Sequence, residues 1–240
     1  EAVRVYRDEM SHDMMVVNTY KEILEIDPEN IAAVDNLVEL YEEMNRSSEL
    51  INSLQKKAEL VDDEDEKIEL HTRVADLFLD KFRNQAEAIS AYESVLEIDP
   101  HHGGALEFLT EMYEKRRDWK KLVGVRRRAV EPIEDEAEKV DELKDVAALA
   151  SDKLRKPEVA TELWKEVREF APADRDALDA LERLFEKARD YEALAETVEQ
   201  KVEHVDDDAE AMKLYQKLGM LYSDRLEDAE LAMEAWQRAL

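Results

Sequence analysis

The residues in this sequence that could do chemistry are carboxylates and a few histidines. The 240-residue chain has 62 Asp and Glu, five His and no Cys. The absence of Cys excludes disulfides, thiolate catalysis and zinc–thiolate sites. The histidines form no metal-binding pair four residues apart with a general-base Glu beside it. His101 and His102 follow Pro100 at an expected helix start, which favours a loop role, and His71 falls at a packing position of the repeat described below.

No motif selects a catalytic couple from the many carboxylates. The four glycines form no phosphate-binding loop, and no Gly-x-Ser-x-Gly nucleophile elbow occurs. The acidic runs at 62–66, 134–136 and 206–208 could be read as calcium loops, but they lack the Gly and the distal Glu of that pattern. We therefore expect a protein that is not an enzyme, with no cofactor and no bound metal.

The charge balance restricts the class of partner. The formal net charge is −28, which opposes binding to nucleic acid and to anionic membranes, because phosphate contacts depend on Lys and Arg. No apolar run approaches the ~20 residues that span a bilayer, so we expect no membrane insertion and a cytoplasmic location. Such a charge favours basic partners, although solubility alone is the simpler interpretation.

The elements that position these residues repeat along the chain. The stretch from Tyr20 to Pro28 returns at Tyr92–Pro100 and, more weakly, at Trp164–Pro172, a step of 72 residues each time. Other positions keep the same register: Ala33, Ala105 and Ala177; Leu37, Leu109 and Leu181; Leu50, Leu122 and Leu194. We divide the chain into a partial repeat at 1–28 and three repeats at 29–100, 101–172 and 173–240.

Each repeat contains two helix pairs. Residues 29–62 and 63–100 each carry two apolar runs with steps of three and four, which is the spacing of one helix face. Asp27-Pro28, Asp99-Pro100 and Ala171-Pro172 end helices, because the residue before Pro avoids helical backbone angles. The acidic runs precede new helices, where carboxylates cap free amides. With four Gly and five Pro in all, the chain is predicted to be all-α.

The last helix pair resembles the tetratricopeptide repeat. The matching residues are Tyr215, Leu218, Gly219, Tyr222, Ala232 and Trp236. The resemblance implies a right-handed α-solenoid of about seven stacked antiparallel hairpins, each burying the apolar stripe of its neighbour. Acidic bacterial repeat chains look similar. Since both ends of the sequence fall within helical patterns, we expect a fragment of a longer array, beginning part-way through a helix at Glu1.

The resemblance also implies a binding surface, because the first helix of each hairpin lines the inner groove in this family. The register places the following residues there: Asp35, Glu39, Glu42, Glu43, Asp76, Glu107, Glu111, Glu114, Asp179 and Arg183. The basic and Asn residues with which co-chaperone members clamp a terminal carboxylate are largely missing. The expected function is therefore a scaffold or adaptor that binds a basic protein or peptide. The alternative interpretation of these acids is a solvated helix face.

Two further features bear on partners. A basic island, Lys115, Arg116, Arg117, Lys120, Lys121 and then Arg126–Arg128, could serve self-association, although pairing with nearby Glu is the simpler interpretation. Trp164 and Trp236 share the register of Tyr20 and Tyr92, which favours core packing over ligand stacking. A second function class is thus a structural spacer or self-assembling array domain within a large repeat protein.

Overall fold

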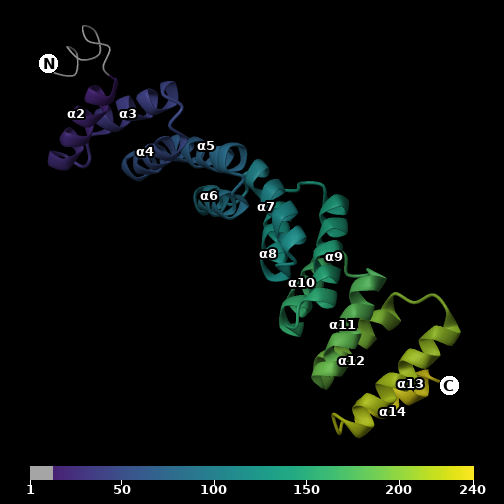
Figure 1. Ribbon diagram of the computed structural model, residues 1–240. Helices are drawn as coiled ribbons and strands as arrows, with labels where there is room; N and C mark the ends of the chain where they lie inside the picture. Colours follow the sequence, from purple (N-terminus) through teal and green to yellow (C-terminus); the bar gives the residue numbers. More distant parts are fainter. Residues whose placement is uncertain (1–12) are drawn as a thin grey trace. The chain divides into compact units, whose positions relative to one another are not determined.

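The chain is all-α over the residues that its structure describes. The computed structural model describes residues 13–240, which form thirteen helices and no strand (Figure 1). The predicted helix fragment at 1–12 lies outside the described residues. The chain divides after Lys115 into two compact units, 1–115 and 116–240, here called the N-terminal and C-terminal units. The prediction of one continuous solenoid over 1–240 stays a prediction.

In the N-terminal unit, consecutive helices stack side by side. Contacts join α2 to α3, α3 to α4, α4 to α5 and α5 to α6, and Tyr92 of α6 packs on Phe108 of α7. The helices are α2 (Asp13–Ile26), α3 (Ile31–Glu43), α4 (Ser47–Leu60), α5 (Glu64–Phe82), α6 (Gln85–Ile98) and α7 (Gly103–Arg116).

The C-terminal unit repeats this arrangement. Each helix from α8 to α14 contacts the next one along the chain, as expected for stacked hairpins, and this confirms the predicted fold class. The helices are α8 (Trp119–Val130), α9 (Glu136–Lys153), α10 (Pro157–Phe170), α11 (Arg175–Ala188), α12 (Tyr191–Glu203), α13 (Asp208–Asp224) and α14 (Ala229–Arg238).

The helix boundaries follow from the residues predicted to set them. Asp63, Asp135 and Asp207, one from each acidic run, are the N-caps of α5, α9 and α13, and their carboxylates accept backbone N–H groups of the first turn. The three predicted Pro stops are also confirmed, since α2, α6 and α10 end two residues before Pro28, Pro100 and Pro172.

The turns inside the shorter hairpins use a left-handed residue without glycine. Asn45, Arg117 and Arg189 have φ values of 54°, 56° and 59° and stand 72 residues apart. This conformation costs a residue with a Cβ about 1–2 kcal/mol. These turns nevertheless form without glycine, of which the chain has only four.

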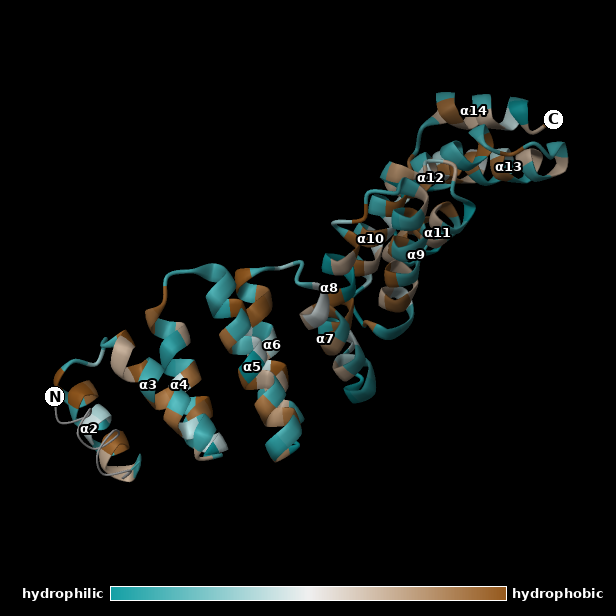
Figure 2. Ribbon diagram, turned by 90° about the horizontal axis from the view of Figure 1, so that it is seen from above, coloured by the Kyte–Doolittle hydropathy of each residue, from teal (hydrophilic) through white to brown (hydrophobic). Residues whose placement is uncertain are grey.

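The core consists of the apolar stripes that the period predicted. Leu109 and Leu181 are fully buried, as are the small residues Ala75 and Ala147 where adjacent helices approach. Along each helix, hydrophobic stretches alternate with hydrophilic ones (Figure 2). One expectation needs correction: Trp164 is buried, but Trp236, which lies over Gly219, is 39% exposed.

Candidate functional site

The predicted binding surface lies on the first helices of the hairpins. In the N-terminal unit these are α3, α5 and α7, and in the C-terminal unit α9, α11 and α13; their outward sides are here called the first-helix face. On α7, for example, Leu106, Leu109 and Tyr113 are buried while Glu107, Glu111 and Glu114 are exposed. The helix therefore presents a row of carboxylates opposite its apolar stripe.

Two of the predicted groove acids in the N-terminal unit are paired with cations from neighbouring helices. The ammonium Nζ of Lys57 in α4 lies 2.8 Å from a carboxylate oxygen of Asp35 in α3 and 2.8 Å from one of Glu66 in α5. These hydrogen bonds, that to Asp35 first, raise the pKa of Lys57. Arg73 of α5 pairs with Glu42 of α3 at 2.5 Å. Cations between hairpins thus hold successive first helices together.

The same pairs recur in the C-terminal unit, 144 residues later. Lys201 Nζ lies 2.5 Å from Asp179, as Lys57 does from Asp35, and Lys217 lies 3.6 Å from Glu186, as Arg73 does from Glu42. Glu182 adds a carboxylate between the two lysines, with contacts of 2.6 Å and 2.7 Å.

Glu182 is a half-buried acid that stays ionised. Burial alone would raise the pKa of its carboxyl group, but the hydrogen bonds from Lys201 and Lys217 outweigh burial and hold that pKa below its usual range. Burial alone would lower the pKa of Lys201, but its hydrogen bonds to Asp179 and Glu182 outweigh burial and raise that pKa. At neutral pH the cluster therefore links α11, α12 and α13 through opposite charges.

The other predicted groove residues fall into three groups. Asp76 accepts a hydrogen bond from the Tyr92 hydroxyl at 3.2 Å, and burial together with this carboxylate raises the pKa of Tyr92 to about 12. Glu39 is exposed, Glu111 pairs with Lys115 on its own helix, and the guanidinium Nε of Arg183 donates to a backbone carbonyl of α11. The remaining three are exposed, and their carboxylates have no ion pair or hydrogen bond within residues 13–240: Glu43, Glu107 and Glu114.

The cations that neutralise this face were not predicted. All four lie outside the family's groove positions: Lys57, Arg73, Lys201 and Lys217. A signal was present in the sequence, because acid and cation recur together: Asp35 with Lys57 returns as Asp179 with Lys201, at the same separation. Comparing pairs of positions between repeats, rather than single positions, would have found them.

A small hollow opens on the first-helix face of the C-terminal unit. It has a volume of about 250 Å³ and lies between α9 and α11, with Trp164 of α10 among its lining residues. The Trp164 indole N–H donates to Ser151 Oγ at 2.9 Å. The lining consists of Ala148, Ser151, Asp152, Trp164, Ala180, Arg183 and Leu184.

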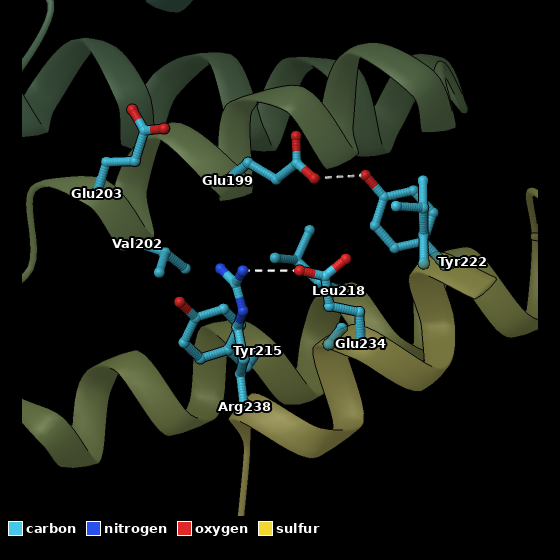
Figure 3. A pocket seen from close by; sticks show the side chains of 10 residues that line it. Glu199, Val202, Glu203, Tyr215, Leu218, Tyr222, Glu234 and Arg238 are labelled. Atoms are coloured by element: carbon cyan, nitrogen blue, oxygen red, sulfur yellow. Dashed lines mark hydrogen bonds and ion pairs between the residues drawn. The ribbon is translucent and has the colours of Figure 1, made fainter. Parts of the chain in front are cut away.

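A larger hollow, of about 370 Å³, lies on the second-helix side, among α12, α13 and α14 (Figure 3). Its polar groups mostly satisfy one another: the Tyr222 hydroxyl donates to Glu199 at 2.7 Å, and Arg238 pairs with Glu234 at 2.7 Å beside the ring of Tyr215. Because these partners are already engaged, the hollow offers few groups to a ligand.

Part of the basic island pairs within the chain, as the simpler interpretation expected. Arg127 lies 2.9 Å from Glu166, Arg126 lies 3.4 Å from Glu142, and Lys115 pairs with Glu111. Self-association through Lys115, Arg116, Arg117, Lys120 and Lys121 stays a prediction.

The described residues bear on two other kinds of site. No group of three or more His, Asp or Glu side chains in residues 13–240 is arranged to hold a metal ion. None of the helices in that range is both long and apolar enough to cross a membrane.

Known proteins give the following similarities. The family model of the tetratricopeptide repeat matches residues 105–140, from α7 through α8 into α9. Similar solved structures include PilF of Pseudomonas aeruginosa (14% identity, 86% of this chain and 95% of that one, TM-score 0.36). YrrB, described as a tetratricopeptide protein with an unusual peptide-binding site, shares 18% identity over 71% and 83% of the two chains (TM-score 0.37). No curated protein matches the sequence.

The family match and the architecture agree. The matched segment begins in α7, one of the helices with the strict 72-residue register, rather than in the last hairpin where the sequence motif is fullest. Stacked two-helix modules with one constant period account for the described residues of both units. Residues 105–140 therefore match the tetratricopeptide repeat, and the described helices of both units pack as a helical repeat of that kind.

Proposed function

We propose that this protein is a non-enzymatic scaffold that binds a basic segment of a partner protein on its first-helix face. The surface is acidic, and the chain as a whole carries a net charge of −28, so electrostatic complementarity favours a segment rich in Lys and Arg. Helical repeats of this kind expose an extended surface that is suited to binding partner proteins.

The observation that carries the proposal is that the middle repeat, 101–172, lacks the cations that pair with the groove acids in the other repeats. Glu107 has the register of Asp35, but the position of Lys57 is taken by Ala129. Glu114 has the register of Glu42, but the position of Arg73 is taken by Asp145. Both carboxylates are exposed and without an ion pair among the described residues.

The unpaired acids define where cations from outside would gain most. An exposed ion pair contributes about 0–1 kcal/mol, so one contact would not hold a partner. Several contacts along α7 and the end of α3 add up and also steer the encounter, and both effects weaken with salt. Asp35 and Glu42 are expected to contribute less to partner binding, because each would first have to give up its ion pair with Lys57 or Arg73.

The test compares two triple variants with the same change in net charge. Glu43, Glu107 and Glu114 are changed to Gln on the first-helix face, and Glu22, Glu25 and Glu87 on the second helices α2 and α6 serve as control. Binding of a synthetic Lys- and Arg-rich peptide is measured by calorimetry at low and physiological salt. We expect the first variant to bind at least several-fold more weakly than the control.

Equal binding by the two variants would show that net charge alone attracts the peptide, and would overturn the proposed face. Absence of binding to wild-type protein, together with a mass that rises with concentration in sedimentation, would favour the self-assembling array instead.

A further inference from the structure

The same packing slot is filled in one repeat and partly empty in the next. In the N-terminal unit, Tyr92 of α6 lies against the ring of Phe108 of α7, with ring centroids 4.6 Å apart, and its hydroxyl is bonded to Asp76 of α5. One aromatic residue of a second helix is thus covered by groups from the first helices on either side.

In the C-terminal unit, alanines occupy the two positions equivalent to Phe108 and Asp76. Trp164 has the register of Tyr92, while Ala180 stands where Phe108 stood and Ala148 where Asp76 stood. The larger indole fills part of the space, yet the hollow of about 250 Å³ remains, and both alanines and Trp164 line it. What is missing from this slot, relative to its counterpart, is an aromatic ring.

We propose that this hollow receives the aromatic side chain of a partner protein segment. Its volume exceeds the roughly 150 Å³ at which an apolar cavity already binds benzene. A ring placed against the indole would gain the offset or tilted stacking that Phe108 provides to Tyr92. The inference rests on the proposed use of the first-helix face, and it names one residue type that the partner must contribute.

The charge at the rim restricts the neighbours of that aromatic residue. Asp152, at the edge of the hollow, is exposed and has no partner among the described residues. Arg183, on the opposite wall, already donates through Nε to the carbonyl of Asp179. The partner segment therefore carries a basic residue next to its aromatic one, so that the ammonium or guanidinium group meets Asp152 while the ring enters the hollow.

A neutral probe tests the hollow separately from the acidic surface. N-acetyl-L-phenylalanine amide is titrated into ¹⁵N-labelled protein while the indole N–H signal of Trp164, assigned with Trp119→Phe and Trp236→Phe variants, is followed. We expect a saturable shift of this signal that persists at high salt, and no shift with N-acetyl-L-alanine amide. Failure of the basic-peptide experiment would leave this result unchanged.

Substitutions that fill the slot should abolish the effect. Ala180→Phe copies the residue of the counterpart slot, and Ala148→Met copies the residue found at that register in the last repeat, Met220, so both side chains occur at these positions already. We expect about tenfold weaker binding or more for Ala180→Phe. Asn36→Phe, at the same register beside Tyr20, is the matched control and should bind as wild type does.

The outcomes separate clearly. Circular dichroism verifies that the variants fold, and Ala148→Met supplies a second blockade if Ala180→Phe does not. An unmoved Trp164 signal, or undiminished binding by both folded variants, would overturn the proposal. Binding of adenosine as strong as that of the phenylalanine derivative would also overturn it, because the hollow would then select any flat ring rather than a protein side chain.

Discussion

At the scale of single residues, a comparison between repeats identifies side chains that lack the hydrogen-bond partner of their counterpart. The Tyr113 hydroxyl of α7 donates to Glu93 of α6 at 2.5 Å. Tyr41 holds the same register in α3, but the position of Glu93 is occupied by Lys21. The buried Tyr41 hydroxyl has no hydrogen-bond partner among residues 13–240. A buried hydroxyl without a partner costs about 1–3 kcal/mol.

Lys21→Glu should therefore stabilise the protein. The new carboxylate would stand where Glu93 stands relative to Tyr113, and we expect the free energy of unfolding to rise by roughly 1–3 kcal/mol. The variant forgoes a distant contact of the Lys21 ammonium with the Tyr41 ring, 6.0 Å from its centroid. Urea denaturation measures the change. Lys21→Met, which removes the charge without adding an acceptor, is the control, and an equal gain in both variants would refute the hydrogen-bond explanation.

At the scale of helices, clusters of charged side chains join neighbouring hairpins. Glu182 lies at the register of Val38, which is buried, and Thr110, which is partly buried. It nevertheless serves as the common carboxylate for Lys201 of α12 and Lys217 of α13. Glu182→Gln would leave two partly buried ammonium groups short of a counter-ion. We expect the loss of roughly 1–3 kcal/mol of stability at neutral pH.

The pH dependence of that loss follows from the direction of the shift. The folded-state pKa of Glu182 lies below its ordinary value, so its contribution is complete above the ordinary value and disappears as pH falls through the lowered one. Wild type and Glu182→Gln should thus converge in stability under acid. Glu186→Gln, whose exposed carboxylate lies 3.6 Å from Lys217, should change little. Parallel stability–pH curves for wild type and Glu182→Gln would contradict this account.

Close packing between two helices gives another prediction at this scale. A Cβ at Gly219 of α13 would lie 2.5 Å from Cε2 of Trp236 in α14, although the equivalent residues Ala75 and Ala147 carry one. Gly219→Ala gains about 1 kcal/mol of helix propensity but forces the indole to move. We expect a net loss of stability with a red-shifted Trp236 fluorescence, recorded in a Trp119→Phe, Trp164→Phe background. Unchanged fluorescence would show that the indole does not define this contact.

The sequence predicted these elements well because their determinants are local. Caps such as Asp63, stops such as Pro100 and apolar stripes such as that of Leu109 act within one or two turns of a helix. The candidate site was predicted only as a set of positions. Which acids remain unpaired depends on whether Lys57 and Arg73 reach them from neighbouring helices. The hollow beside Trp164 forms because the small side chain of Ala180 leaves space there. Both features depend on contacts between helices, which no local sequence pattern specifies.

At the scale of the whole molecule, stability should be distributed along each unit, because within a unit the described helices contact mainly the helices next to them along the chain. Leu109 and Leu181 test this, since they share one register, are both fully buried and belong to different units. Leu→Ala at either site should cost about 2–5 kcal/mol through lost burial and the cavity left behind. In a cooperative globule that cost would be felt everywhere, whereas in a repeat array it is shared with nearest neighbours.

Hydrogen exchange distinguishes the two cases helix by helix. Leu109→Ala should speed amide exchange in α6 and α7 while α12 to α14 keep wild-type protection, and Leu181→Ala should speed exchange in α10 to α12 while α3 to α5 keep theirs. Leu231→Ala, at a side chain that is 38% exposed, should alter little and serves as the control. Uniform loss of protection across both units in either variant would mean that the chain unfolds as one body, and the first-helix face would then depend on all the hairpins rather than on those that carry it.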